Sequence, residues 1–322
     1  MKLRSLPVRL ARAFRLESAW LRKFAHLGSV HAPEWFKRSS PYAIATLMFA
    51  LVPARRRAAV KNLEHALGAG RWVAHWAALR MYAEFAFCLS ETMEHYSPRA
   101  RPLRVDLPAQ DPVVDAIAAG RGAVVVTGHI GSWDIAAKVL REKQYPVHVV
   151  MGRETDAGTA EFVEAIRSRA GVNVVVPEGS VFSSLGLVRA LRRNEIVAIQ
   201  LDRAAAAGGL RRLPFLGALA PFPSGPFVLA RLTGAPVIPV FAPRLGRRHY
   251  AIQIGRPVEV PRGARNGRVL DRVMREVVSQ LEDAVRRDPC QWFQFEPFWP
   301  GPTEPSAEET AGAAEAMAGR PE

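Results

Sequence analysis

A histidine and an aspartate five residues apart are the first candidates for chemistry in this sequence. His129 and Asp134 belong to the run Val-Val-Val-Thr-Gly-His-Ile-Gly-Ser-Trp-Asp at residues 124–134. A carboxylate that holds one ring nitrogen of an imidazole lets the other nitrogen act as a general base. The pair has no serine placed as in a hydrolase triad, so the natural proton source is a hydroxyl of the substrate. This predicts direct acyl transfer to an alcohol.

The position of His129 and Asp134 in the chain is better evidence for a catalytic role than the spacing between them. Eight histidines and 30 acidic residues would give about 0.7 such pairs by chance. However, His129 lies between Gly128 and Gly131, where an apolar run ends and a helical pattern begins. In a continuous helix the two side chains would point about 140° apart, so His129 must stay in the loop and Asp134 in the first helical turn for them to meet. The alternative is a histidine that merely caps the turn.

The sequence around this turn alternates strand and helix patterns. Strands are expected at residues 122–127, 147–151, 172–176, 196–201, 236–241 and near 249–260, and helices at 112–120, 132–143, 159–170, 182–193 and 267–287. This order predicts an α/β fold with a mainly parallel central sheet flanked by helices. Ligands bind at the carboxyl ends of the strands in such sheets, where His129 lies. Ser132 is expected to cap the helix that follows.

Other polar residues fall at strand ends or at the start of a helix. Arg153 and Arg203 would place cations beside the histidine, able to bind phosphate or a developing oxyanion, although either could form a surface ion pair. Asp202 could bind polar groups of a substrate, orient an arginine or form a structural ion pair. Ser224 and Gly225 open a helix whose free N–H groups would bind phosphate if they face the cleft.

Composition limits the class of protein. The chain has 322 residues, 49% of them apolar, which is enough for one large α/β domain with additions. Two cysteines, Cys88 and Cys290, exclude a disulfide framework and favour a reducing, cytosolic-side location. The net charge is +14, and because residues 301–322 carry −4, the first 300 carry +18. Such a charge favours anionic partners, namely membrane, acidic protein or phosphorylated substrate, whereas no nucleic-acid-binding module is recognisable.

The first 108 residues are expected to form helices that associate with a membrane. Residues 7–24 form a basic amphipathic pattern typical of an interfacial helix, or of an ordinary surface helix. The apolar residues 41–53 would rise only about 20 Å as a helix, short of the roughly 30 Å hydrocarbon core, so they would enter one leaflet or form a buried core helix. Amphipathic helices at 54–67 and 71–96 follow, and no signal peptide is evident.

The remaining chain divides into a catalytic domain and a tail. Residues 97–108, rich in proline and arginine, read as a link into an α/β domain at 109–300. The aromatic stretch 288–300 at its end is expected to seal the core or to contact the lipid edge. Residues 301–322 have the composition of a disordered acidic tail.

A known family shares these motifs. Residues 128–134 resemble the Gly-His-x-Gly-x-Trp-Glu/Asp signature of the lipid A biosynthesis (lauroyl/myristoyl) acyltransferases, a branch of the lysophospholipid acyltransferase superfamily. Further blocks are similar in the same order over about residues 40–300: Arg55-Arg56-Arg57 with Lys61-Asn62-Leu63, Arg153 with Arg167, Arg169 and Gly171, Asp202 with residues 213–217, residues 230–240, and Pro289 with Gln291-Trp292.

The resemblance implies a function and assigns roles to residues. His129 and Asp134 would form the catalytic dyad, and Arg153 would help to bind substrate. The donor would be an acyl thioester on acyl carrier protein or coenzyme A, and the acceptor a glycolipid or lysolipid, with a lipid A precursor as one candidate. The site would lie on the cytoplasmic face of the bacterial inner membrane, with the protein peripheral or monotopic, and would use no metal or other cofactor.

These residues together predict a mechanism. His129 would remove a proton from the acceptor hydroxyl while Asp134 balances the imidazolium charge, and the alkoxide would attack the thioester in one displacement. Backbone N–H groups near Gly131, or Arg153, would stabilise the oxyanion. One alternative is a lipid hydrolase, disfavoured because no Gly-x-Ser-x-Gly occurs. Another is a catalytically inactive membrane-surface protein of the same fold.

Overall fold

The computed structural model describes residues 27–95, 97, 100–150, 173–176, 181–203, 209–262 and 267–299. The predicted helices at 7–24 and 159–170, the predicted substrate-binding Arg153 and the tail at 301–322 lie outside the described residues.

A six-stranded sheet forms the centre of the molecule, with the strand order β11-β8-β2-β5-β3-β4. β11 pairs antiparallel with β8, and the other four pairings are parallel. The strands are β2 (Ala123–Thr127), β3 (Val147–Val150), β4 (Asn173–Val175), β5 (Ile196–Gln200), β8 (Val237–Phe241) and β11 (Gln253–Ile254). This confirms the predicted α/β class with a mainly parallel sheet.

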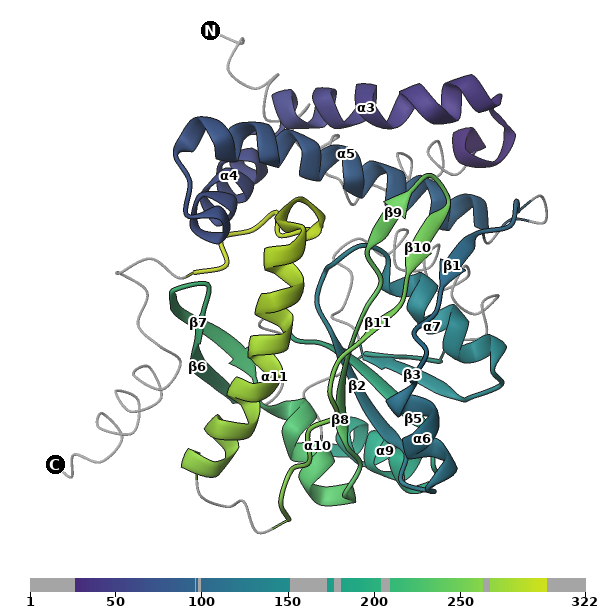
Figure 1. Ribbon diagram of the computed structural model, residues 1–322, viewed down its shortest axis with the longest axis vertical. Helices are drawn as coiled ribbons and strands as arrows, with labels where there is room; N and C mark the ends of the chain where they lie inside the picture. The colour runs from purple at the N-terminus through teal and green to yellow at the C-terminus, as the bar shows by residue number, and fades with distance from the viewer. Residues whose placement is uncertain are drawn as a thin grey trace, which may run out of the picture.

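Helices cover both faces of this sheet (Figure 1). They are α6 (Pro112–Ala118), α7 (Trp133–Glu142), α9 (Val181–Arg192), α10 (Gly225–Thr233) and α11 (Gly267–Arg287). Side chains of β2 alternate between the faces, as the pleat of a strand requires. Val124 and Val126 pack with α9, α10 and α11, whereas Ala123 and Val125 pack with α6 and α7. Each fully buried aliphatic side chain contributes about 1.5–3 kcal/mol, so the short apolar strand is held firmly on both faces.

A hairpin that the sequence analysis missed precedes α10. β6 (Leu210–Phe215) pairs antiparallel with β7 (Ala218–Pro223) through a two-residue turn. Both turn residues have positive φ, 51° at Leu216 and 87° at Gly217. A hairpin turn of this type usually carries Asn-Gly or Asp-Gly, and leucine in its place conceals it from sequence inspection.

Three helices form a layer across one end of the molecule (Figure 1): α3 (Glu34–Leu51), α4 (Pro53–Leu67) and α5 (Arg71–His95). Most of the predicted apolar segment 41–53 forms the second part of α3, which ends at Leu51, packs Pro41, Ala45 and Met48 inward and leaves its other side exposed, whereas Pro53 begins α4. None of the helices in the described residues combines the length and apolar character needed to cross a membrane.

A second sheet connects this layer to the central sheet. Its order is β1-β10-β9, formed by β1 (Arg104–Asp106), β10 (His249–Ala251) and β9 (Arg244–Gly246). β1 lies in the stretch at 97–108 that the sequence analysis read as a link, and its pairing with β10 is parallel.

The aromatic segment after α11 seals the core, which is one of its two predicted roles. It begins with a short 3-10 helix, η1 (Pro289–Gln291), and Trp292, Phe293, Gln294, Phe295 and Phe298 are all buried. Asn62 of α4 holds it: its amide nitrogen donates to the carbonyls of Gln294 (3.2 Å) and Glu296 (2.7 Å), and its amide oxygen accepts from the Phe298 N–H (3.1 Å). We call residues 289–299 the closing segment.

Replacing Asn62 tests this anchor. The variant Asn62→Ala should lower the free energy of unfolding by about 1–3 kcal/mol, because buried backbone groups of the closing segment lose their partners. Urea unfolding followed by tryptophan fluorescence measures the change. The matched control is Lys61→Ala, at an exposed position of the same helix. Equal stability of the two variants would contradict the anchoring role of Asn62.

Candidate active site

The candidate site lies where two adjacent strands of the central sheet end. β2 and β5 pair in parallel, from Ala123 opposite Ile196 to Thr127 opposite Gln200, so the residues that follow them meet. His129 follows β2 and Asp202 follows β5. The Nδ1 atom of His129 lies 2.7 Å from Oδ1 of Asp202, and the backbone N–H of His129 donates to Oδ2 of the same carboxylate, also over 2.7 Å.

The carboxylate of Asp202 is buried, and both of its oxygens accept hydrogen bonds. It is 1% exposed, and besides the two hydrogen bonds from His129 it accepts one from the indole Nε1 of Trp292 at 2.9 Å. The side chain of Gln294 donates to the Asp202 carbonyl at 2.6 Å. Burial opposes ionisation, but the charge of His129 and the hydrogen bonds from His129 and Trp292 lower the pKa of Asp202 to about 2. The carboxylate is therefore ionised at neutral pH.

The expected partner of the imidazole was Asp134. The structure places Asp134 in the first turn of α7, as predicted, but the carboxylate at Nδ1 of His129 is that of Asp202, 73 residues along the chain. At this strand end, Asp202 was expected to bind polar groups of a substrate, to orient an arginine or to form a structural ion pair. Its relation to His129 depends on β2 and β5 being neighbours, which a single sequence does not reveal.

The histidine loop is held by backbone contacts on two sides. The N–H of Gly131 donates to the Gln291 carbonyl (3.1 Å), that of Ser132 to the Ala242 carbonyl (3.0 Å), and the His129 carbonyl accepts from the Phe293 N–H (2.8 Å). Gly131 has φ +62°, and a Cβ there would lie 2.0 Å from the Ala242 oxygen. Only glycine fits both the conformation and the space. The Gly131 N–H, expected to bind an oxyanion, is already engaged with a carbonyl.

Ser132 occupies the N-cap position of α7 as predicted, but its side chain makes no capping hydrogen bond. Its hydroxyl lies 3.0 Å from that of Thr92 on α5. The serine therefore ties the histidine loop to the helical layer.

Three further predicted site residues in the described part of the chain, Arg203, Ser224 and Gly225, lie near helix or strand ends and make no polar contact with His129. Arg203 is exposed next to Asp202. Ser224 is the N-cap residue of α10, and its hydroxyl donates to the Gly209 carbonyl at 2.9 Å, while Gly225 is the first helical residue. Within the described part of the chain, none of these three side chains or backbones forms a hydrogen bond or ion pair with His129.

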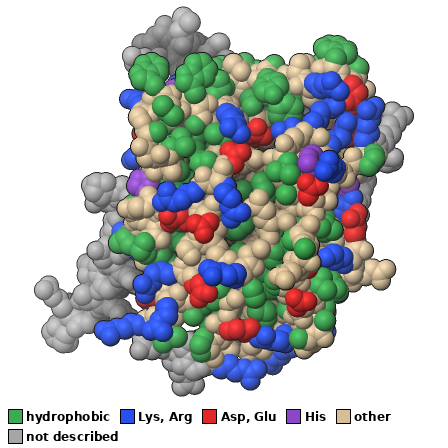
Figure 2. All heavy atoms as spheres, viewed as in Figure 1, with side chains coloured by type: hydrophobic (Ala, Val, Ile, Leu, Met, Phe, Trp, Pro, Cys, Tyr) green, Lys and Arg blue, Asp and Glu red, His purple; other side chains and the backbone are tan. Residues whose placement is uncertain are grey.

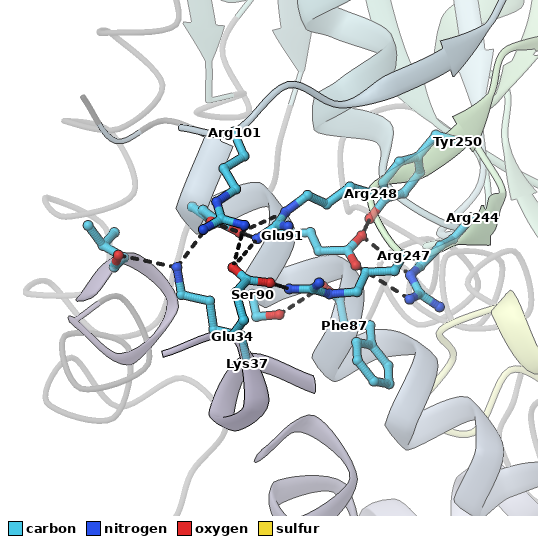
Figure 3. A network of polar contacts seen from close by, with 12 residues as sticks. Glu34, Lys37, Phe87, Ser90, Glu91, Arg101, Arg244, Arg247, Arg248 and Tyr250 are labelled. Carbon is cyan, nitrogen blue, oxygen red and sulfur yellow. Dashed lines mark hydrogen bonds and ion pairs between the residues drawn. The ribbon is translucent and has the colours of Figure 1, made fainter. Parts of the chain in front are cut away.

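A network of buried and partly buried charges joins the helical layer to β9 and β10 (Figure 3). Glu91 of α5 accepts from the Tyr250 hydroxyl at 2.7 Å and pairs with Arg244 at 3.4 Å. The backbone N–H and carbonyl of Arg244 both bind the side chain of Gln291, at 2.7 and 2.8 Å. Because the Gln291 carbonyl holds Gly131, α5 is connected through β9 to the histidine loop.

The same network reaches α3. Arg248 pairs with Glu94 of α5 at 2.8 Å and with Glu34 of α3 at 3.1 Å, and Lys37 pairs with Glu94 at 3.0 Å. Hydrogen bonds from Arg248 and Arg247 lower the pKa of Glu34 to about 2. Removing one partner of a buried ion pair leaves an uncompensated charge, so these contacts fix how the helical layer sits on the sheets.

A cavity of about 360 Å³ lies behind the loop, lined in part by Ile130, Arg244 and Gln291. Charged side chains that line it form ion pairs with one another, for example Arg80 with Asp288 at 3.2 Å and Arg244 with Glu84 at 3.0 Å. The described residues contain no group of three or more histidine, cysteine, aspartate or glutamate side chains placed to hold a metal ion.

Comparisons with known proteins show relatives of the chain and its family. Two proteins named phosphatidylinositol mannoside acyltransferase are similar to the chain, both from Mycobacterium tuberculosis. The one from strain CDC 1551 / Oshkosh is 25% identical over 209 residues, which cover 65% of this chain and 64% of that protein. The one from strain ATCC 25618 / H37Rv is 24% identical over 185 residues, covering 57% and 56%. The matched stretches thus span less than two thirds of these relatives.

A family model matches most of the chain, including the candidate site and the closing segment. The match runs over residues 9–300 with the model described as bacterial lipid A biosynthesis acyltransferase. It begins before the helical layer and ends just after the closing segment, so the match extends over every element described above. The chain belongs to the bacterial lipid A biosynthesis acyltransferase family.

Proposed function

We propose that this protein transfers a fatty acyl chain from a thioester, on acyl carrier protein or coenzyme A, to a hydroxyl of a membrane glycolipid or lysolipid. The observation that carries the proposal is the 2.7 Å contact between His129 Nδ1 and a buried, ionised Asp202 at the carboxyl end of the sheet. Membership of the family supports the reaction class. The two relatives named for acylating phosphatidylinositol mannoside support a glycolipid acceptor over a lysolipid, and a lipid A precursor remains the other glycolipid candidate.

The hydrogen bond to Asp202 determines which ring nitrogen of His129 can act as a base. An ionised carboxylate only accepts hydrogen bonds, so Nδ1 must carry the hydrogen that it shares with Asp202. In the neutral imidazole the lone pair is then on Nε2. Asp202 is fully buried, so in this proposal it positions the imidazole rather than binding substrate.

The proposed reaction is a single displacement. Nε2 of His129 removes the proton of the acceptor hydroxyl as its oxygen attacks the thioester carbonyl carbon. The tetrahedral intermediate collapses, the carbon–sulfur bond breaks, and the imidazolium returns the proton to the leaving thiolate. Asp202 offsets the positive charge on His129 while it exists. The enzyme forms no covalent intermediate in this scheme.

The remaining predicted residues keep supporting roles in the proposal. Asp134 is retained as a catalytic candidate from the first turn of α7, and Arg153 and Arg203 as cations for the phosphate groups of the substrates. Ser224 and Gly225 would contribute the N-terminus of α10. Gly131 is a weaker candidate for an oxyanion donor than expected, because its N–H would have to leave the Gln291 carbonyl.

We also propose that the helical layer binds the cytoplasmic surface of the inner membrane, with the protein peripheral or monotopic. Large apolar side chains are exposed on α3 and at the start of α5, including Trp72 (80% exposed), Trp76 (72%) and Trp35 (70%). Figure 2 shows hydrophobic side chains gathered along the edge that α3 forms. Tryptophan beside basic residues, here Arg38 and Arg71, is typical of surfaces that lie in the interface of an anionic membrane.

Three variants test the catalytic pair. His129→Ala should abolish acyl transfer, and Asp202→Asn should lower kcat by about 10³–10⁴-fold, because an amide can hold the imidazole in the wrong tautomer. Asp134→Asn is the matched control, since it makes the same change five residues from His129, and we expect a smaller loss from it. Transfer of radiolabelled acyl groups from acyl carrier protein and from coenzyme A to an extracted lipid fraction measures all three.

The activities of these variants distinguish the role of His129 from the roles of the two aspartates. Near-normal turnover by His129→Ala would remove the general base from the proposal. A loss that is larger for Asp134→Asn than for Asp202→Asn would return the orienting role to Asp134.

Placing negative charges on the exposed tryptophan positions of α5 tests whether this helix contacts the membrane. Trp72→Glu with Trp76→Glu should weaken binding to vesicles containing phosphatidylglycerol by tenfold or more, about what loss of one buried large apolar side chain gives. The melting temperature should stay close to that of the parent, because both side chains are exposed. Leu219→Glu, at an exposed apolar position on β7, is the control. Equal vesicle binding by the two proteins would exclude α5 as the contact surface.

A further inference from the structure

The carboxylate of Asp202 receives three hydrogen bonds, and the third comes from the closing segment. His129 supplies two of them, to Oδ1 through its ring and to Oδ2 through its backbone. Trp292 donates its indole N–H to Oδ2 at 2.9 Å, from 90 residues along the chain. A carboxylate rotates about a single bond unless its oxygens are fixed. Because the third donor holds Oδ2, it also restrains the direction of Oδ1.

A second tryptophan shows that packing alone does not explain this contact. Trp299 lies in the same aromatic cluster, with its ring centroid 5.9 Å from that of Trp292, and both rings contact Phe215 and Phe298. In the described structure the indole nitrogen of Trp299 is buried without a hydrogen-bond partner. The cluster therefore accommodates an indole whose N–H is unused, whereas the N–H of Trp292 is directed at the one buried carboxylate beside the histidine.

The residues next to Trp292 contact the same pair. The N–H of Phe293 donates to the His129 carbonyl at 2.8 Å, and the side chain of Gln294 donates to the Asp202 carbonyl at 2.6 Å. Three consecutive residues of the closing segment thus bind His129 or Asp202. The trio is held from the other side by Asn62, which binds the Gln294 carbonyl.

We propose that Trp292 is a positioning residue of the catalytic pair: its indole N–H fixes the rotation of the Asp202 carboxylate so that Oδ1 stays on Nδ1 of His129. This inference rests on the proposed function, because it assumes that His129 is the base. The hydrogen bond also stabilises the ionised carboxylate. Without it, Oδ2 of Asp202 keeps only the backbone N–H of His129 as a donor, so the carboxylate is less restrained and holds the imidazole less firmly in one orientation.

The test replaces the indole N–H while keeping an aromatic ring. Trp292→Phe should lower kcat by about 10- to 100-fold, the range expected for losing one hydrogen bond to a charged group, with KM for the acyl donor unchanged. The matched control is Trp299→Phe, which removes the same atoms from the same cluster and should leave kcat within twofold. Steady-state transfer assays on the full chain measure both values.

A spectroscopic measurement distinguishes positioning from packing. A buried Nδ1–H shared with a carboxylate gives a proton resonance far downfield, which Nδ1-specific ¹⁵N labelling of histidine assigns to His129. We expect this resonance to move or broaden in Trp292→Phe and to stay in Trp299→Phe. If both variants keep the parent resonance and kcat, the inference is wrong, even when His129→Ala is inactive. If His129→Ala retains activity, the proposed function fails instead.

A second substitution covers the case in which Trp292→Phe fails to fold. Replacing Trp292 with β-(3-benzothienyl)alanine by codon suppression exchanges the indole N–H for sulfur and keeps the size and shape of the side chain. The same fall in kcat and change in the resonance should follow. A folded benzothienyl protein with parent kcat would overturn the inference.

Discussion

The structure depends on one buried carboxylate. An ionised group removed from water carries a large desolvation cost, which hydrogen-bond donors and a nearby cation must offset. Asp202 meets this condition with two donors from His129 and one from Trp292. The end of β5, the loop after β2 and the closing segment are thereby bound to one another through a single charge. Moving any one of them would separate that charge from at least one of its donors.

The segments around Asp202 are in turn held by the helical layer. The closing segment is held by Asn62 of α4, and the loop is held by Thr92 of α5 through Ser132. Glu91 of α5 pairs with the side chain of Arg244, and the backbone N–H and carbonyl of Arg244 bind the side chain of Gln291. The helices that present exposed tryptophans are thus part of the same set of contacts as the histidine. The exposed tryptophans and the histidine loop are therefore supported by the same helices, so their relative positions are set by one set of contacts.

Sequence reasoning succeeded where the signal was local. The helix predicted at 267–287 has those bounds in the structure, and the strand before His129 lies where its valines placed it, because apolar periodicity reports local structure directly. A single sequence does not carry the features that depend on distant segments. The partner of His129 follows from strand order, the engagement of the Gly131 N–H follows from where Gln291 folds back, and the β6–β7 hairpin was hidden by leucine at a turn position with positive φ.

The five-residue spacing between His129 and Asp134 has two physical explanations, and only one of them is catalytic. An acidic residue in the first turn of a helix is stabilised by about 0.3–1 kcal/mol through the helix dipole, whatever its neighbours do. Asp134 occupies that turn of α7. An aspartate at position 134 is therefore favoured by the helix that follows the histidine loop, while the carboxylate 2.7 Å from Nδ1 of His129 is that of Asp202, which follows the neighbouring strand. Asp202 is 1% exposed and follows β5, a strand paired on both sides, so its carboxylate holds the ring of His129 from inside the core of the fold.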